Sequence, residues 1–432
     1  MRLRIFITTA LMAVLIGCNS APPTPQLTLH DGVYWSSHYQ SFLHVQRQVV
    51  TRYQWTPSQC WAADTGLLPR VFSTAADPGQ HVWIGAGERT IVLQRRSDGL
   101  PVVFTREPML PKHCAQAPTA TAATAVTALV EILEQFQHSL PAVQLLQWRA
   151  HAELLDRATG VHELDRQLSL FELLSQMLDH SGDEHAFLLA KDLERYHRVS
   201  QFSVGEAQRE RARQQLLQEL QSSSLRSSCD QGLWWGRLSS GEFYLGVTRL
   251  YRFSPEAAYS EMGQRCLQRA LYAMADELKY IVHGQGHPVQ LVIDLRFNEG
   301  GSLLLASQLA NSLQPLTEPL AVIRRQAVDE RRNPDLSGLH QGGKVLVTEL
   351  TASAAEHLAH ALQLRGFKLH GQQTRGAFAP TTVKSLPNGW VVGISMYAPA
   401  EVVDGRGQAL PEGDGLVPDV VLAPAVLFPP AQ

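Results

Sequence analysis

The chain of 432 residues is poor in charge: only 18% of its residues are charged, and 37 basic residues nearly balance 40 acidic ones. A net charge of −3 supplies no basic face for phosphates, which argues against a general nucleic-acid binder. Beyond the N-terminal segment, no apolar run approaches the length that spans a bilayer. With 44% hydrophobic residues the chain is globular, and its length predicts two or three domains.

Several sequence motifs of cofactor, metal and hydrolase chemistry are also absent. The chain has neither a Walker loop nor a G-x-G-x-x-G fingerprint, so we expect no cofactor. His357 and His360 lie three residues apart without the H-E-x-x-H arrangement of zinc proteases, and we expect no metal. A G-x-S-x-G elbow is missing, which argues against an α/β-hydrolase.

Cysteine is scarce and odd in number, and the N-terminus accounts for one of the five. Residues 1–17 combine a basic start with a short apolar run, as in an export signal. The segment ending in Cys18 resembles the bacterial lipobox, which implies cleavage before Cys18 and lipid attachment to it. An ordinary cleaved signal with an incidental cysteine is the alternative. We expect a lipid-anchored protein of the bacterial cell envelope that faces the periplasm, and Asn19 favours the outer membrane.

The other four cysteines are an even number, and disulfides are permitted outside the cytoplasm. Three pairings are possible. We favour Cys60 with Cys114 and Cys229 with Cys266, because each bond would close a loop within one predicted domain.

The pattern of the chain changes from strands to helices and then to an alternation of both. Short strand-like runs at 81–87, 89–96 and 101–106 are separated by Gly, Asp and Pro turns. Helical spacing of apolar residues follows, and strands then alternate with helices from about residue 242. We predict a tether at 18–26, a small β-rich domain at 27–114, a linker at 115–125, a helical region at 126–229 and an α/β core at 230–432.

Two segments of this core could carry chemistry. In 294–301 a strand runs into paired glycines, whose bare backbone can approach a reacting group closely. Ser353 lies where a strand gives way to a helix. Such a serine can be a simple N-cap, but the position also suits a nucleophile, because helix N-terminal amides stabilise an oxyanion.

Together, the two segments resemble the tail-specific protease superfamily, which includes C-terminal processing peptidases, the tricorn core protease and interphotoreceptor retinoid-binding modules. The resemblance covers about 126–422. It implies a crotonase-like (ClpP/crotonase-type) α/β fold with Ser353 as nucleophile, and an oxyanion hole formed by Gly300 or Gly301 together with Ala354. The matching residues are Asp294, Arg296, Asn298, Gly300, Gly301 and the segment 351–356, with Glu299 in place of a usual glycine.

The branch of the superfamily depends on the general base. C-terminal processing peptidases carry a lysine where this chain has Ala377, and Lys368 or Lys384 would have to be recruited from other positions. A PDZ segment is not evident either. The tricorn-like branch uses histidine and glutamate instead.

The tricorn-like resemblance assigns the base to His185 and its orienting carboxylate to Glu412, which precedes a G-V-x-P-D-like segment. Asp183 and Glu184 remain alternative carboxylate partners. We expect a serine endopeptidase that cleaves peptides or unfolded protein tails through an acyl-enzyme. The alternative is a catalytically inactive module on the same fold that binds apolar ligands or peptides.

Overall fold

The computed structural model describes residues 29–67, 81–95, 101–136, 138, 140–199, 205–253, 261–315, 333–396 and 408–423. The predicted export signal, Cys18 and the tether lie outside these residues. Within them, no helix is both long enough and apolar enough to cross a membrane.

The N-terminal sheet consists of seven antiparallel strands in the order β4-β3-β2-β1-β7-β6-β5. The three strands predicted from 81 to 106 are present as β5, β6 and β7. A disulfide joins Cys60, at the start of β4, to Cys114 in the short helix η2 (Lys112–Ala115). The strands are β1 (Gly32–Ser36), β2 (Ser41–Gln46), β3 (Val49–Trp55), β4 (Cys60–Gly66), β5 (His81–Ala86), β6 (Thr90–Arg95) and β7 (Pro101–Glu107).

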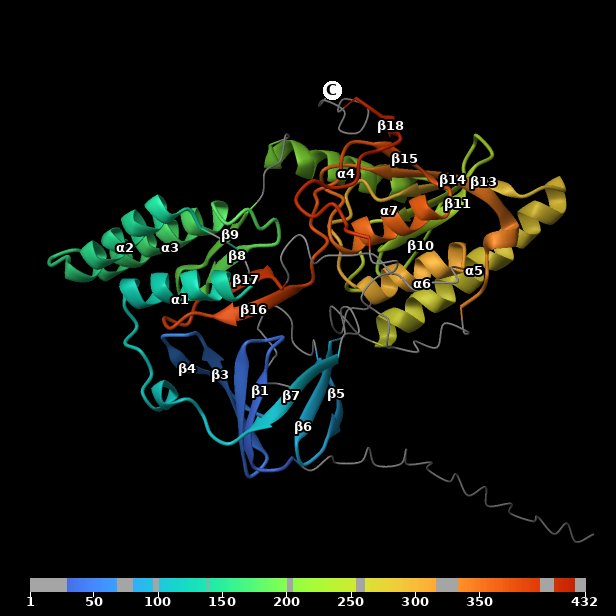
Figure 1. The fold of residues 1–432 in the computed structure, drawn as a ribbon. Coiled ribbons are helices and arrows are strands. Elements are labelled where there is room, and N and C mark those ends of the chain that lie inside the picture. The colour runs from blue at the N-terminus through green and yellow to red at the C-terminus, as the bar shows by residue number, and fades with distance from the viewer. Residues whose placement is uncertain are drawn as a thin grey trace, which may run out of the picture.

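Three helices follow, α1 (Ala122–Gln135), α2 (Ala142–Arg157) and α3 (Glu163–Asp179). Thr121 caps α1 by accepting the N–H of Thr124, so the helix begins inside the predicted linker. Figure 1 shows these helices above the N-terminal sheet.

The region expected to be helical also contains strands. The connecting sheet has the order β16-β17-β8-β9, so two of its strands come from this region and two from near the C-terminus. Helical periodicity does not report such pairing, because the partners are far apart in the sequence. The strands are β8 (Phe187–Ala190), β9 (Arg195–Arg198), β16 (Thr381–Ser385) and β17 (Val391–Ser395), with the short helix η3 (Lys191–Leu193) after β8.

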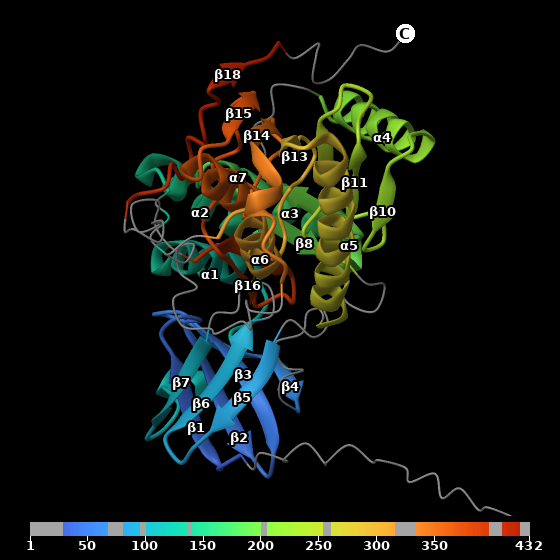
Figure 2. The same ribbon diagram turned by 90° about the vertical axis from the view of Figure 1, so that its right-hand side faces the viewer.

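The core sheet has the order β10-β11-β12-β13-β14-β15-β18, in which β12 to β15 and β18 run parallel. This is the predicted α/β alternation. Figure 2 shows α5 alongside the strands. The elements are α4 (Glu206–Ser222), β10 (Arg226–Ser228), β11 (Leu233–Arg237), β12 (Phe243–Val247), α5 (Glu261–Gln285), β13 (Val289–Asp294), α6 (Leu303–Leu313), η5 (Ser337–Leu339), β14 (His340–Val347), α7 (Ala354–Leu364), β15 (Lys368–Gly371) and β18 (Val420–Val421).

The described residues bury two large hydrophobic cores. One lies between the core sheet and α5, α6 and α7, while Leu216 and Leu220 of α4 cover the opposite face of the sheet. The strand β13 is buried along almost its whole length, as expected for a strand covered on both faces.

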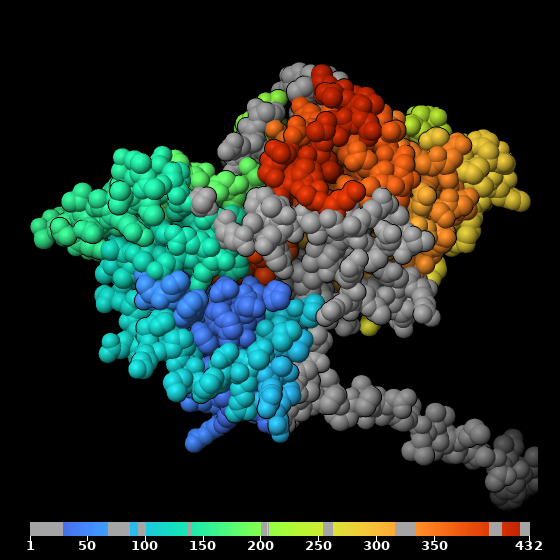
Figure 3. Space-filling model, in the orientation of Figure 1, coloured from blue at the N-terminus to red at the C-terminus, as the bar shows by residue number. Residues whose placement is uncertain are grey.

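The second core joins three parts of the chain that are distant in sequence. Residues of the N-terminal sheet such as Tyr34 and Leu43 share it with α1, α3 and the connecting sheet, including Trp390 and Ile394. Lys384 of β16 lies at this junction, where its buried ammonium donates to the carbonyl of Tyr39. The space-filling view in Figure 3 shows the N-terminal sheet packed against the helices.

Candidate active site

Ser353 lies at the N-terminus of α7, a few residues beyond the end of β14. Its φ of 56° is in the left-handed region, which costs a non-glycine residue of order 1–3 kcal/mol. Strain of this kind persists only where the surroundings impose it, and it concentrates at functional sites.

Glycine 300 packs directly against this serine. A Cβ built on Gly300 would lie 2.6 Å from the Cβ of Ser353, and the φ of Gly300 is 97°. The adjacent Gly301 is equally restricted, since a Cβ there would lie 2.5 Å from the carbonyl oxygen of Leu250. At both positions only glycine fits, because the backbone has a positive φ and a side chain would collide with its neighbours.

One of the three backbone amides predicted for the oxyanion hole already has a hydrogen-bond acceptor in the structure. The N–H of Gly300 donates to the side chain of Asn298 at 2.9 Å, so it is already occupied. The N–H groups of Gly301 and Ala354 find no acceptor among the residues that the structure describes. These two amides are therefore the ones that could still donate to a bound group.

The polar residues of the 294–301 segment build this loop. Asp294 accepts from the guanidinium of Arg296 and from the hydroxyl of Tyr244 at 2.9 Å. Asn298 is fully buried; its side-chain amide donates to Val247 at 2.9 Å, and its carbonyl accepts from Ala352 at 3.1 Å. These contacts hold the glycine turn against the segment that carries Ser353.

Glu356 fixes the serine from the other side. It is fully buried, and its carboxyl accepts the backbone N–H of Ser353 at 3.0 Å. It also accepts from Thr374 at 2.5 Å and from the backbone N–H groups of Gly376 and Ala377 at 2.7 and 2.8 Å. Burial raises the pKa of Glu356 to about 7, against the lowering effect of these donors.

His185 is oriented by a serine and an aspartate. Its Nδ1 lies 3.2 Å from the hydroxyl of Ser395, which donates to Asp183 at 2.7 Å. The backbone N–H groups of both His185 and Ser395 also donate to Asp183, at 3.0 and 2.7 Å. Asp183 is only 4% exposed, so this aspartate and serine form a buried support for the imidazole.

The other ring nitrogen of His185, Nε2, is buried and has no hydrogen-bond partner among the described residues. Burial is the main effect on the pKa of this imidazole, and the charges of Arg375 and His357 lower it further. His357 follows Ser353 by four residues and therefore shares its helix face. Burial lowers the pKa of His185 to about 4, which leaves the ring neutral at pH 7.

Glu412, predicted as the orienting carboxylate, accepts the N–H groups of Phe378 and Ala379 at 2.6 and 3.0 Å. Among the described residues it makes no hydrogen bond with His185. Burial raises its pKa to about 8, and the charges of Glu356 and Asp183 act in the same direction. Of the carboxylates considered from the sequence, Asp183 is the one in place behind His185; Glu184 has its pKa raised by burial and lies within the field of Arg375.

Comparison with known proteins gives a family for the core. Residues 249–422 match the family model described as peptidase family S41. Over these residues the chain is similar to peptidase family S41. The chain therefore carries the core of a serine peptidase, as the resemblance to tail-specific proteases implied. The match includes Ser353 and Glu412 but begins only after His185 in the sequence.

No functionally curated protein matches the chain. Similar solved structures include a candidate peptidase from Parabacteroides merdae, with 18% identity and a TM-score of 0.48 over 71% of this chain and 90% of that one. A lipoprotein from Streptococcus agalactiae shares 14% identity, with a TM-score of 0.41 over 74% and 96%. The photosystem II D1 C-terminal processing protease shares 23%, with a TM-score of 0.28 over 43% of each chain. Likenesses this weak support no statement about activity.

In this S41 core, neither lysine considered as an alternative base is available. Lys368 pairs with Asp419 at 3.2 Å, on an exposed part of the surface. Lys384 is buried against Tyr39 at the junction with the N-terminal sheet, and burial lowers its pKa. The amide of Ala377, at the position of the missing lysine, instead donates to Glu356.

Glu299, the departure from the glycine-rich motif, ties the glycine turn of the S41 core to the preceding region. Its carboxylate pairs with Arg198 of β9 at 2.7 Å and with Arg213 of α4 at 3.2 Å. These arginines lower the pKa of Glu299, although burial acts to raise it. Glu299 thus links the glycine turn to β9 and α4.

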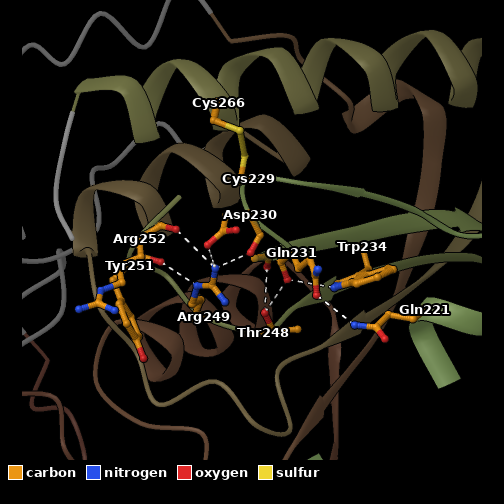
Figure 4. Close-up of polar contacts among 11 residues, drawn as sticks. Gln221, Cys229, Asp230, Gln231, Trp234, Thr248, Arg249, Tyr251, Arg252 and Cys266 are labelled. Carbon is orange, nitrogen blue, oxygen red and sulfur yellow. Dashed lines mark hydrogen bonds and ion pairs between the residues drawn. A yellow bond between two sulfur atoms is a disulfide. The ribbon is translucent and has the colours of Figure 1, made fainter. Parts of the chain in front are cut away.

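A second support for the glycine turn begins at Leu250, which bridges to Gly301 as in a parallel sheet. Its neighbour Arg249 donates to Asp230 at 2.8 Å and to the carbonyl of Tyr251 at 3.2 Å (Figure 4). Asp230 follows Cys229, which is joined to Cys266 of α5 by a disulfide. Both disulfides thus have the pairing favoured from the sequence.

Ser395 was not found by sequence analysis. It is a serine in a strand, and only the pairing of β17 with β8 brings it opposite His185. The role of Asp183 was left open for the same reason, because its contact with Ser395 spans 212 residues of sequence.

Proposed function

We propose that this protein is a serine endopeptidase that cleaves peptides or unfolded protein tails through an acyl-enzyme at Ser353. In this proposal His185 is the general base. Asp183 orients it through Ser395, and the N–H groups of Ala354 and Gly301 stabilise the oxyanion.

The chemical steps follow from these roles. The Oγ of Ser353 attacks the scissile carbonyl carbon while its proton moves to Nε2 of His185. Collapse of the tetrahedral intermediate breaks the C–N bond, and the leaving amine takes that proton. Water then attacks the ester and gives a proton to His185, and the peptide leaves as a carboxylic acid when the Ser353 oxygen regains its proton.

The observation that carries the proposal is the left-handed backbone of Ser353 at the helix N-terminus, held by Gly300 and Glu356 with two free amides beside it. An N-cap needs no such backbone, because capping residues prefer the extended region. An inactive binding module would not need a strained serine backbone beside two unpaired amides.

Two finer features belong to the same proposal. The run of parallel strands β12 to β15, with α5, α6 and α7 between them, supports a crotonase-like core. The lipobox-like segment supports a lipid anchor at Cys18 in the bacterial cell envelope, with Asn19 favouring the outer membrane. Metabolic labelling with an alkynyl fatty acid in a bacterial host should mark the wild-type protein and not a Cys18→Ala variant.

A fluorophosphonate probe tests the catalytic proposal directly, because it reacts with activated serines without requiring the natural substrate. We expect labelling of the wild-type protein, none with Ser353→Ala, and a loss of at least about 100-fold in rate with His185→Ala. Circular dichroism establishes that each variant is folded. Equal labelling of the wild-type protein and Ser353→Ala would exclude Ser353 as the nucleophile.

A further inference from the structure

The turn between β10 and β11 has a backbone conformation that residues other than glycine rarely adopt. The φ angles of Cys229, Asp230 and Gln231 are 55°, 53° and 63°. Left-handed conformations normally occur as single residues, and a run of three persists only where the surroundings impose it. Residues 229–232, which we call the anchored turn, therefore depend on support from other parts of the chain.

A disulfide and an arginine support the anchored turn from two sides (Figure 4). Cys229 is buried and is joined to Cys266 of α5. Arg249 donates to the carbonyl of Asp230 and, at 2.8 Å, to its carboxylate. Because the side chain of Asp230 is 60% exposed, the ion pair itself contributes little, and the bond to the carbonyl is the more important contact.

The residues on either side of this arginine are joined to the same turn. The N–H of Thr248 donates to the carbonyl of Gly232 at 3.0 Å, and its hydroxyl donates to the carbonyl of Gln231 at 3.0 Å. Phe253 packs against the same glycine, since a Cβ built on Gly232 would lie 2.6 Å from its ring. The segment that follows β12 is therefore held in a fixed position relative to the anchored turn.

The backbone of the next residue in that segment, Leu250, holds the glycine turn. Its N–H donates to the carbonyl of Gly300 at 3.0 Å, and its carbonyl accepts the N–H of Ser302 at 2.7 Å. The carbonyl of Gly300 and the N–H of Gly301 belong to one peptide unit, and in a planar trans peptide these two groups point in opposite directions. The bond from Leu250 therefore directs the N–H of Gly301 away from Leu250.

The direction of this N–H matters for the proposed chemistry. Gly301 supplies one of the two amides proposed to stabilise the oxyanion, and the adjacent Gly300 packs directly against Ser353. A donor stabilises an oxyanion only when it is aimed at the place where the charge develops. Loosening the bonds of Leu250 would let this peptide turn and would misalign the amide.

We propose that Arg249 is a positioning residue for the amide of Gly301, and that peptidase activity depends on the Cys229–Cys266 disulfide that holds the anchored turn. The inference rests on the proposed function for the role of this amide. Oxidation joins the two sulfurs and transfers two electrons and two protons to a partner disulfide, which becomes a dithiol; a dithiol reductant reverses the exchange. The cysteine pair thereby makes the alignment of the amide sensitive to the redox state of the compartment.

Removing each disulfide separately tests this dependence. The double variant Cys229→Ser/Cys266→Ser should lower the rate of fluorophosphonate labelling about 10- to 100-fold, because misplacing a group by about 1 Å can cost about 100-fold in rate. Cys60→Ser/Cys114→Ser is the matched control, since it removes the disulfide between β4 and η2 and should label like the wild type. Dithiothreitol should slow labelling of this control, in which only the Cys229–Cys266 bond remains. This comparison also serves if the first double variant does not fold.

Substitutions of Arg249 test the positioning role without touching the disulfide. Arg249→Met keeps the length of the side chain and removes its donors, and we expect kcat for a fluorogenic peptide to fall about tenfold with KM changed less than about twofold. Arg249→Lys should recover about a third of the wild-type kcat, because its ammonium can still pair with Asp230. Arg226→Met is the control: Arg226 pairs with Glu277 of α5 at 3.3 Å from the far end of the β10 strand, and its loss should leave kcat unchanged.

Amide hydrogen exchange separates this inference from the proposed function. The N–H of Ser302, which is bonded to Leu250, should exchange at least about tenfold faster after loss of the Cys229–Cys266 bond, whether or not the protein labels. Equal loss of labelling in the two disulfide variants, or an unchanged kcat in Arg249→Met, would overturn the inference. A wild-type protein that does not label, but whose Ser302 amide exchanges faster without this disulfide, refutes only the proposed activity.

Discussion

The hydroxyl of Ser395 lies between the imidazole of His185, at 3.2 Å, and the carboxylate of Asp183, at 2.7 Å. Since the hydroxyl donates to the carboxylate, it must accept from Nδ1, and His185 then carries its proton on Nδ1. That tautomer leaves Nε2 free to accept the proton of Ser353. The aspartate therefore acts on the histidine through a neutral group instead of by direct contact.

Replacing Ser395 with alanine should reduce activity by loosening the orientation of His185. We expect kcat to fall about 10- to 100-fold with little change in KM, since the substitution removes no substrate contact. Steady-state kinetics with a fluorogenic peptide separates the two parameters. Ser312→Ala on α6 is the control, because Ser312 is equally buried and lies away from the site. A raised KM with unchanged kcat would assign Ser395 to substrate binding.

Gly300→Ala should abolish most activity through a steric clash with the nucleophile. The new methyl group would lie 2.6 Å from the Cβ of Ser353, and displacement of a reacting group by about 1 Å can cost about 100-fold in rate. Gly160→Ala isolates the conformational effect, since its φ is also positive but no atom lies within 4 Å of the added methyl. Both variants should lose roughly 1–2 kcal/mol of stability, while only the first loses fluorophosphonate labelling. Retention of labelling by Gly300→Ala would contradict the packing described here.

The labelling rate should stay constant from neutral pH down to about pH 5 and fall by half near pH 4. Burial lowers the pKa of His185 to about 4, so the base is protonated only below that pH, whereas an ordinary histidine is protonated near 6.5. The charge of Asp183 raises this pKa, so Asp183→Asn should move the acid limb to still lower pH. A limb near pH 6.5 in folded protein would show that His185 is solvated.

Thermal stability should decrease as the pH rises from 6.5 to 8. Burial raises the pKa of Glu412 to about 8 in the folded protein, against about 4.5 when exposed, so folding retains a proton that the unfolded chain has released. The folded state then binds more protons, and its stability falls with pH across this window. Glu412→Gln should flatten the dependence between pH 7 and 8 in a differential scanning experiment. An unchanged slope in that variant would mean that Glu412 is ionised in the fold.

The sequence identified the parts of the site that are local in the chain. Ser353 at a strand–helix junction and the paired glycines after β13 are short-range patterns, and the structure has them where they were predicted. The same patterns could not show that the N–H of Gly300 is already bound to Asn298, because a hydrogen bond within a turn depends on its dihedral angles.

The parts that the sequence could not supply depend on long-range pairing. Ser395 reaches His185 across 210 residues, and the connecting sheet draws its strands from two distant segments. Glu412 follows the expected motif, yet its carboxylate faces the amides of Phe378 and Ala379. Motif spacing gives the residue type but not the direction of the side chain.

The N-terminal sheet and the connecting sheet share one hydrophobic core, and this core can form only when both sheets have been synthesised. The strands that enclose Tyr34 and Leu43 emerge early, whereas Trp390 and Ile394, which close the same core, emerge near the end. Domains begin to fold from the N-terminus as the chain is made, but this core cannot close before Trp390 and Ile394 have been synthesised. Ser395 is made with them, and the imidazole of His185 therefore lacks its hydrogen-bond partner until the chain has been extended past residue 395.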